Sequence, residues 1–206
     1  MRKRFGFAII AVGAVLILAA LLLLLMNRSE DKMAGEKAEE IVKSIETVIA
    51  AQEESDVREE SRQESSREEP VQEKKMTVVM LDGYGYIGYL EIPALELKLP
   101  VMDEWDYNRL QIAPCRQAGS VYTDDLVIAA HNYQSHFGRL KELGTGDTVT
   151  FTDMEGTVHT YEVRVIRTLQ PDAVDEVIHS GYDLVLYTCT PGGATRVTVF
   201  CTRVEE

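Results

Sequence analysis

Two strongly apolar segments of this chain each end on a side chain that can transfer a proton or act as a nucleophile. Residues 127–132 read VIAAHN and contain His131, and residues 184–193 read LVLYTCTPGG and contain Cys189. A third segment, TRVTVF, places Arg196 at its beginning. A thiol attacks a carbonyl group as the thiolate, and a neighbouring imidazolium favours that form. A fixed guanidinium can then stabilise the developing oxyanion, and such a donor is typically worth about 100- to 1000-fold in rate.

The elements around these residues are suited to hold them in place. Short apolar runs that stop at a turn predict β-strands, so His131 and Cys189, 58 positions apart, are expected at strand ends. That is the rigid mounting that a nucleophile and its base require. Arg196 would open the strand after Cys189 and reach the same place. From the pattern alone, a buried cysteine and a strand-end histidine explain these residues as well as catalysis does.

From Met76 onward the chain consists of short β-rich runs separated by Gly, Pro and Asp. We expect strands at Tyr86–Ile92, Leu97–Val101, Leu126–Ala130, Thr148–Thr152, Val158–Leu169, Leu184–Thr188 and Arg196–Arg203. Short helical turns are expected at Trp105–Leu110, Ser135–Leu140 and Asp172–Ile178. Many strands with few helices predict a mostly β fold, a closed or nearly closed barrel.

The amino terminus has the pattern of a membrane anchor. No charged residue occurs over the 22 positions from Phe5 to Met26, which is enough to cross a hydrocarbon core of about 30 Å. Arg2, Lys3 and Arg4 precede this run, so we expect a cytoplasmic amino terminus and an extracellular carboxy-terminal domain. A cleaved signal peptide is the alternative, but its apolar region is usually shorter, and no small-x-small cleavage site follows Leu25.

Two different segments connect the anchor to the β-rich region. Residues 33–51 carry apolar side chains at helical spacing and predict an amphipathic helix, either a stalk or a helix packed on the domain. Residues 52–75 are charged and have too few apolar side chains to fold, which predicts an extended linker. The expected domains are therefore 1–26 (basic tip and anchor), 27–75 (helix and linker) and 76–206 (catalytic domain). A chain starting near residue 76 should then be about as stable as one starting near residue 27.

The charge excludes one class of partner. The net charge is −13, and residues 76–206 contain 19 acidic against nine basic residues, so nucleic-acid binding is not expected. No pair of histidines has metal-ligand spacing, and we expect neither a metal nor a cofactor. His136, His159 and His179 lie among polar residues and are expected to have no catalytic role.

The remaining candidates are weaker. The three cysteines leave at least one thiol unpaired within the chain. Cys201 lies on the opposite strand face from Arg196 and is expected to be structural, while Cys115 is expected in a loop, and a Cys115–Cys201 disulfide is left open. Trp105 and Tyr107 are expected to pack a helix. Thr188 and Thr190 flank Cys189 and are candidates for binding substrate.

Three segments together resemble the sortase family. Residues 183–203, DLVLYTCTPGGATRVTVFCTR, are similar to the sortase signature, in which a Thr-Leu-x-Thr-Cys strand end is followed by an arginine on the next strand. Leu186, Thr188 and Cys189 match it, and Val185 replaces the first threonine. Residues 129–163 resemble the family's histidine segment, and residues 86–102 resemble its opening pair of strands. The likeness covers about residues 85–204.

The resemblance implies an eight-stranded sortase-type β-barrel and a transpeptidase. It implies that Cys189 forms a thioester with a sorting signal, that His131 serves as acid and base, and that Arg196 holds the substrate and its oxyanion. The implied partners are secreted proteins with a C-terminal sorting signal, and an acceptor amine of a cell-wall precursor or a pilin lysine. The subclass (B-like or D-like) and the sorting motif are left open. An extracellular cysteine hydrolase of the same fold and a non-catalytic surface module are the alternatives.

Overall fold

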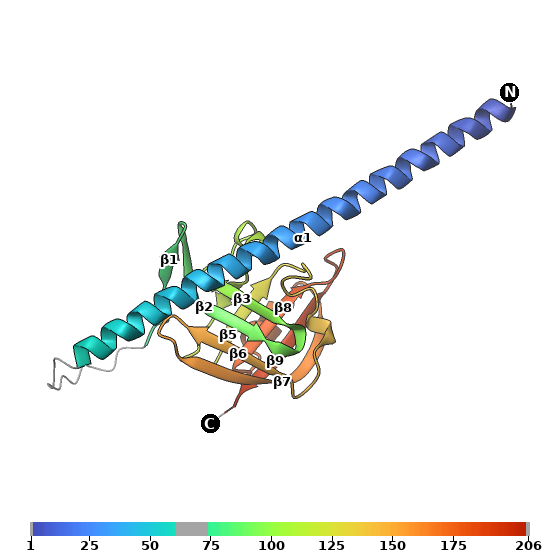
Figure 1. The fold of residues 1–206 in the computed structure, drawn as a ribbon. Helices are drawn as coiled ribbons and strands as arrows, with labels where there is room; N and C mark the ends of the chain where they lie inside the picture. The colour runs from blue at the N-terminus through green and yellow to red at the C-terminus, as the bar shows by residue number, and fades with distance from the viewer. Residues whose placement is uncertain (1, 61–73, 205–206) are drawn as a thin grey trace. The chain divides into compact units, whose positions relative to one another are not determined.

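A computed structural model describes residues 2–60 and 74–204 of the chain. It divides into two compact units, residues 1–33 and 34–206. The first unit is helical and is the first part of helix α1 (Arg2–Glu60). The second unit contains the rest of α1 and all of the β-strands (Figure 1).

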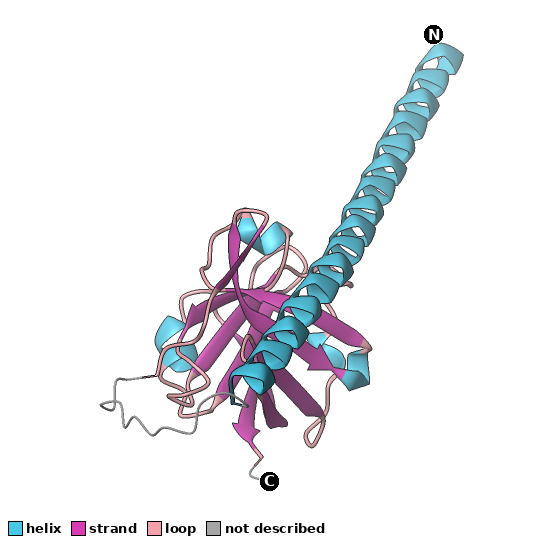
Figure 2. Ribbon diagram, turned by 60° about the vertical axis from the view of Figure 1, so that its left-hand side comes forward, coloured by secondary structure: helices cyan, strands magenta, loops and turns pink. Residues whose placement is uncertain are grey.

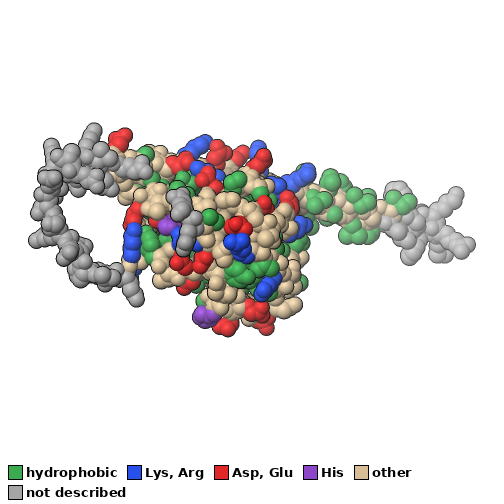
Figure 3. Space-filling view, turned by 90° about the horizontal axis from the view of Figure 1, so that it is seen from below, with side chains coloured by type: hydrophobic (Ala, Val, Ile, Leu, Met, Phe, Trp, Pro, Cys, Tyr) green, Lys and Arg blue, Asp and Glu red, His purple; other side chains and the backbone are tan. Residues whose placement is uncertain are grey.

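The first unit is a strongly apolar stretch of helix. Its leucine and isoleucine side chains from Ile10 to Leu25 are more than half exposed, and they are drawn in green in Figure 3. Among the described residues, one helix is long and apolar enough to cross a membrane. Burying such side chains in lipid is favourable for the same reason that burying them in a protein core is. The predicted anchor therefore lies in a helix of suitable length and composition.

In its described residues, the second unit contains nine strands, three short 3₁₀ turns and one short α-helix in addition to the rest of α1. The strands are β1 (Val79–Leu81), β2 (Tyr84–Ile92), β3 (Leu97–Met102), β4 (Cys115–Ala118), β5 (Leu126–Ala130), β6 (Thr148–Asp153), β7 (Val158–Leu169), β8 (Leu184–Cys189) and β9 (Arg196–Arg203). The turns and the helix are η1 (Pro93–Leu95), η2 (Arg109–Gln111), η3 (Leu140–Glu142) and α2 (Val174–Ile178).

Eight of these strands close into a barrel (Figure 2). The order is β2-β3-β4-β5-β8-β9-β7-β6, and β6 pairs back onto β2. The β3–β4 and β5–β8 pairs are parallel, and the other pairs are antiparallel. Strand β1 extends β2 as a hairpin outside the closed ring. The predicted eight-stranded β-barrel is confirmed.

All seven predicted strands are present, with ends that differ by at most two residues from the expected ones. Two strands were missed, and both are short. Strand β4, which reads CRQA, lacks an alternating apolar pattern and was expected to be a loop around Cys115. Strand β4 is formed by its pairing with β5 and by a single bridge from Cys115 to Met102 of β3. The predicted helical turns are shorter than expected, and the 105–110 turn is reduced to η2.

Strands β5 and β8 are buried on both faces. Leu126, Ile128 and Leu186 point into the main core of the barrel. Val127 and Val185 face outward, where Val177 of α2 and Phe200 of β9 cover them. This explains the near-continuous apolar sequence of the two strands, because a strand with two buried faces has no side for polar residues.

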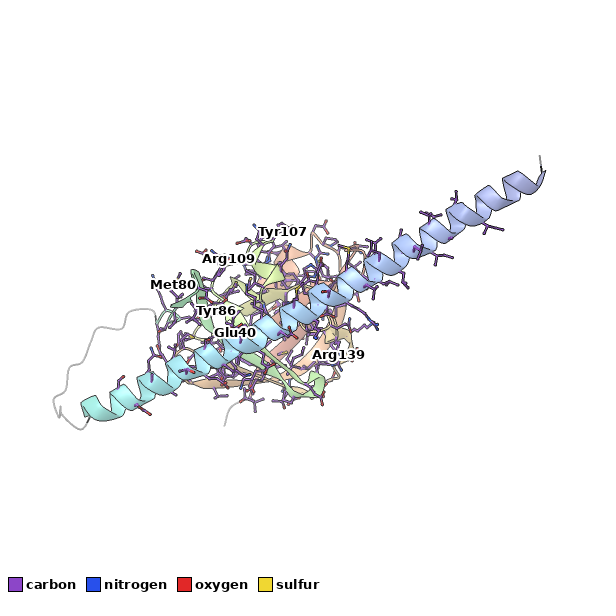
Figure 4. All side chains as sticks on the ribbon, turned by 45° about the horizontal axis from the view of Figure 1, so that its top comes forward. Glu40, Met80, Tyr86, Tyr107, Arg109 and Arg139 are labelled. Carbon is purple, nitrogen blue, oxygen red and sulfur yellow. The ribbon has the colours of Figure 1, made fainter. Side chains whose placement is uncertain are left out.

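Helix α1 packs on the barrel from Ala34 onward (Figure 1). Its buried positions repeat every three or four residues, and they are Ala34, Ala38, Ile41, Val42, Ile45 and Ile49. Ile41, Ile45 and Ile49 share a cluster with Tyr86 and Met102 of the barrel. Glu40 lies on the exposed side of the helix, as Figure 4 shows. The amphipathic stretch is therefore part of the folded unit and not a free stalk.

This packing corrects two expectations. The helix continues to Glu60, so residues 52–60 are helical and not an extended linker. Residues 61–73 of the predicted linker lie outside the described part of the chain. A chain that starts at residue 76 would also expose the apolar barrel surface that α1 covers, so its stability should not match that of a longer chain.

We expect Ile45→Ala to lower the free energy of unfolding of a chain of residues 34–206 by about 2–4 kcal/mol. Ile45 is fully buried against the barrel, so the substitution loses apolar contacts and leaves a cavity. Urea unfolding measures the change. Thr47→Ala, at an exposed position of the same helix, is the control and should change the value by less than about 0.5 kcal/mol. Equal effects of the two substitutions would show that the helix does not pack on the barrel.

A buried ionic cluster joins β6, β7 and β9. The Nε2 atom of His159 lies 3.0 Å from Oδ2 of Asp153, and its Nδ1 atom lies 2.9 Å from Nη1 of Arg203. Arginine can only donate, so Nδ1 accepts and Nε2–H donates to Asp153. His159 is thus buried, with polar groups of Asp153 and Arg203 on both of its ring nitrogens. His136 is also buried, whereas His179 is exposed and pairs with Asp175.

Burial alone raises the pKa of Asp153, but hydrogen bonds from His159 and from the backbone N–H groups of Thr157 and Glu155 outweigh it and hold the pKa below 3.8. The carboxylate therefore stabilises the fold above the pKa of the unfolded chain, and the contribution is lost as the pH falls through the lower pKa of the folded state.

Asp153→Asn should accordingly lower the free energy of unfolding by about 3 kcal/mol at neutral pH, because it removes the buried partner of His159. The difference from the wild type should shrink as the pH falls below 3.8. Urea unfolding at several pH values tests this. Asp175→Asn is the control, because it changes an Asp–His pair that is exposed. A difference that is independent of pH would contradict the ionic origin of the effect.

Candidate active site

The three predicted catalytic residues are brought together by strand register. Ala130 of β5 pairs in parallel with Thr188 of β8, and the next residues of the two strands are His131 and Cys189. On the other side, Cys189 pairs with Arg196 of β9. Adjacent strands lie about 4.8 Å apart. Cys189 is therefore placed between His131 and Arg196 at one end of three neighbouring strands.

The threonines beside Cys189 fix the strand end and the turn that follows. The Thr188 hydroxyl is buried and donates to the Ala130 carbonyl at 2.9 Å. Thr190 contacts Thr195 through backbone and side-chain hydrogen bonds, which closes the turn to β9. Gly192 and Gly193 have φ of 84° and 75°, a conformation that glycine adopts without strain. A role of Thr188 or Thr190 in binding substrate stays a prediction.

His131 has two neighbours that the sequence did not single out. Its Nδ1 atom lies 3.0 Å from Oδ1 of Asn132. The ring of Tyr133 stacks on the imidazole, with centroids 4.1 Å apart and planes inclined by 5°. The sequence HNY shows that a polar and an aromatic side chain follow the histidine. It does not show that either contacts the imidazole, because such contacts depend on the conformation of the loop.

The loop after His131 folds back tightly on itself. The backbone N–H of Phe137 donates to the carbonyl of His131, and that of Gly138 donates to the carbonyl of Tyr133. A Cβ atom at position 138 would lie only 2.5 Å from the carbonyl oxygen of Asn132, so a side chain does not fit there. Phe137 is fully buried and ties the loop to the core. Arg139, labelled in Figure 4, donates to the carbonyl of Leu95.

Arg196 is held over the turn that follows Cys189. Its Nη1 atom donates to the carbonyls of Gly193 and Thr195, both at 3.0 Å. A guanidinium has five N–H donors, so the Nε and Nη2 groups are left for a further partner. The side chain is half-buried and lines the same cleft as Cys189.

Cys189 opens into a cleft of about 290 Å³. It is lined by residues of β4, β5, β8 and β9 together with residues from the segments 105–110 and 169–177. The lining residues are Trp105, Tyr107, Leu110, Gln117, Ala129, Ala130, Leu169, Gln170, Pro171, Ala173, Val174, Val177, Tyr187, Thr188, Cys189 and Arg196. Most of these side chains are apolar or aromatic. Within this lining, the Tyr187 hydroxyl contacts Oε1 of Gln117, and burial raises the pKa of Tyr187 to about 12.

The structure corrects the expectation for Trp105 and Tyr107. They line the cleft, whereas the sequence led us to expect that they pack a helix. Their rings contact each other edge to face at 5.0 Å, and they are 37% and 76% exposed. Figure 4 shows Tyr107 and Arg109 on this outer loop. Asp106 shapes the loop, because its Oδ1 atom accepts from the backbone N–H groups of Asn108 and Arg109.

The other two cysteines are buried thiols. All three cysteines are free, and Cys201 lies in the main barrel core whereas Cys115 lies in the cluster beneath α1. Burial is the main cause that raises the pKa of each of these two thiols to about 12. Cys201 is structural, as expected, and Cys189 is the one cysteine that is partly exposed. Within the described ranges, no group of three His, Cys, Asp or Glu side chains is arranged to hold a metal.

Comparison with known proteins identifies the family. A model of the sortase domain matches residues 90–204, more than half of the chain. Sortase C1 of Streptococcus agalactiae is 30% identical, with a TM-score of 0.53, over 62% of this chain and 72% of that one. Sortase C of Streptococcus pneumoniae is 28% identical, with a TM-score of 0.53, over 59% and 70%. Sortase C of Clostridium perfringens is 25% identical, with a TM-score of 0.50, over 59% and 71%. None of the curated protein sequences matches.

The fold and these matches define the class of the protein. The chain belongs to the sortase family, whose members are cysteine transpeptidases.

The three thiols should differ in their reactivity. We expect iodoacetamide to modify Cys189 first in the folded protein, because burial and a raised pKa both protect Cys115 and Cys201. Mass spectrometry of the digested protein would locate the modification. The Cys189→Ala variant should stay unmodified until it is denatured. Rapid modification of Cys115 or Cys201 in the native protein would contradict the arrangement of the two buried thiols.

Proposed function

We propose that this sortase-family protein is a transpeptidase that cleaves a sorting signal through a thioester on Cys189 and transfers the acyl group to an amine. The observation that carries the proposal is the register of β5, β8 and β9, which sets Cys189 beside His131 and opposite Arg196. The cleft that contains Cys189 and Arg196 also supports it, because a mostly apolar and aromatic lining suits the side chains of a bound peptide.

The first half-reaction consumes the sorting signal. The Cys189 thiolate attacks the carbonyl carbon of the scissile peptide bond, and the oxygen takes up the negative charge. Arg196 stabilises this oxyanion through the N–H groups that the turn carbonyls do not use. The C–N bond then breaks, and the His131 imidazolium gives its proton to the departing amine. The products are a thioester on Cys189 and a released carboxy-terminal peptide.

The second half-reaction releases the enzyme. An acceptor amine attacks the thioester carbon and gives a proton to His131, and the C–S bond breaks to restore the thiolate. The acceptor that we propose is an amine of a cell-wall precursor or of a pilin lysine. The similarity to the S. pneumoniae sortase C, whose structure concerns pilin substrate specificity, is the reason to test these amines as acceptors. Attack by water would make the same chain a hydrolase.

The activity test uses the full chain, a sorting-signal peptide library and an amine acceptor, with products identified by mass spectrometry. Cys189→Ala should abolish both cleavage and transfer, and Arg196→Lys should reduce kcat/KM by at least about 100-fold, because an ammonium cannot reproduce the planar guanidinium. The rate should depend on pH as a bell whose two limbs report the coupled Cys–His pair. Cys201→Ala is the control and should change stability alone.

Each outcome selects one of three functions. Joined peptide and amine would support the transpeptidase. Cleavage without transfer would favour the hydrolase. Full turnover by Cys189→Ala would end the thioester mechanism, and a folded wild-type chain that cuts no peptide of the library would favour the non-catalytic surface module.

We also propose that α1 anchors the protein in the cell membrane with the barrel outside the cell. The support is the long apolar stretch of α1 together with the basic residues Arg2, Lys3 and Arg4 before it. Protease added to wall-free cells should then release the barrel into the medium and leave the apolar segment in the membrane. Antibodies against the two parts can follow this separation. A barrel that resists protease until the cells are lysed would contradict the orientation.

A further inference from the structure

The imidazole of His131 is held by two side chains of its own loop. Tyr133 covers one face of the ring in a nearly parallel stack, 4.1 Å between centroids. Asn132 holds its edge, because Oδ1 lies 3.0 Å from the Nδ1 atom. One contact fixes the plane of the imidazole and the other fixes its rotation in that plane, so the two together define where the second nitrogen, Nε2, lies.

Both contacts are compatible with the neutral and the protonated ring. In the neutral ring, an Nδ1–H that donates to Asn132 leaves the lone pair on Nε2. In the imidazolium, Nδ1–H can donate to the same oxygen, and the π face of a tyrosine attracts a cation. The ring can therefore gain and lose a proton at Nε2 without moving. A residue that protonates one amine and deprotonates another needs this property.

Tyr133 is itself fixed by the fold of the loop. Its carbonyl accepts from the N–H groups of His136 and Gly138, at 3.0 and 2.8 Å. The buried ring of His136 meets the Tyr133 ring edge to face, with centroids 5.5 Å apart. The tyrosine thus connects the buried base of the loop to the imidazole of His131.

Helix α1 supports the same loop from outside. The backbone of the helix passes close to the loop at Gly35, because a Cβ atom added there would lie only 3.0 Å from Cβ of Ser135. Ala38, one turn further, is in the same core cluster as Phe137 and Leu140. The loop that carries Tyr133 is therefore packed between helix and barrel.

We propose that Tyr133 is a positioning residue for transpeptidation, which keeps the His131 imidazole aligned with Cys189 through both half-reactions. The inference rests on the proposed function, in which His131 is the acid and base. His131 and Tyr133 both lie outside the lining of the cleft, and the Tyr133 ring is stacked on the imidazole, so we assign Tyr133 an action on His131 and not on the peptide. Its loss should lower kcat and leave KM nearly unchanged, because misplacement of a catalytic group can cost about 100-fold in rate.

The test compares Tyr133→Leu with Tyr133→Phe in the full chain in detergent. Leucine removes the aromatic ring, whereas phenylalanine keeps it and removes the hydroxyl group. We expect Tyr133→Leu to reduce kcat by about 10- to 100-fold with KM unchanged, and Tyr133→Phe to stay within about twofold of the wild type. Tyr84→Leu is the matched control, because Tyr84 is half-buried in a different cluster, and it should change neither constant.

A spectroscopic measurement reports the stack without relying on activity. In the Cys189→Ala background, with ¹³C-labelled histidine, the ring protons of His131 should be shifted upfield by the ring current of Tyr133. Tyr133→Phe should keep this shift and Tyr133→Leu should remove it. The chain has four histidines, so a His131→Gln variant suffices to assign the signal.

The outcomes separate the two proposals. Loss of the shift in Tyr133→Leu with an unchanged kcat would overturn the positioning role, as would equal losses of kcat in the Leu and Phe variants, or no upfield shift in the parent protein. A drop in kcat together with loss of the shift, both restored by phenylalanine, would establish it. A wild-type chain that shows the shift but transfers no acyl group would overturn the proposed function and, with it, the role in that reaction.

Discussion

The parallel pairing of β5 with β8 is the interaction on which the site depends. A parallel pair places residues that follow matched positions side by side at the same edge of the sheet. The pairing of Ala130 with Thr188, reinforced by the Thr188 hydroxyl, sets His131 next to Cys189. A slip of one residue would turn Cys189 to the other face of β8, away from the cleft and from Arg196. The arrangement of the site thus follows from the backbone pairing of β5 with β8.

Burial on both faces makes this register rigid. The inner face of β5 and β8 is part of the barrel core, and the outer face is covered by α2 and by neighbouring side chains. A register shift would expose apolar side chains on one face and strain the packing on the other. The side chains of His131 and Cys189 are carried just beyond the last buried residues of the two strands. The polar ends of the strands can therefore open into a cleft while their backbones stay fixed.

Two other groups of contacts support this arrangement from a distance. The second half of α1 covers the barrel surface near Tyr86 and Met102, and its Gly35 contact backs the loop that follows His131. The cluster of Asp153, His159 and Arg203 connects β6, β7 and β9 through buried hydrogen bonds. The first group joins a helix to the loop of the proposed base, and the second helps to close the sheet into a barrel.

The sequence by itself determined the elements whose pattern is local. Strands β7 and β9 were predicted with their observed ends, because the apolar pattern and the turn residues lie within each segment. The candidates His131, Cys189 and Arg196 were also evident, since strand ends can be read from where an apolar run stops. The resemblance to sortases then gave these residues an order and a chemistry.

Tertiary structure decided what depends on contacts between distant segments. Strand β4 has no pattern of its own and forms because β5 provides its hydrogen-bond partner. Residues 34–49 showed an apolar face, but that face alone did not tell a stalk from a packed helix, because the surface it covers is made from several strands. The aromatic lining of the cleft and the stack of Tyr133 on His131 were likewise not readable. Both depend on the conformations of loops in the folded chain. One example is the close approach of Gly138 to the carbonyl of Asn132.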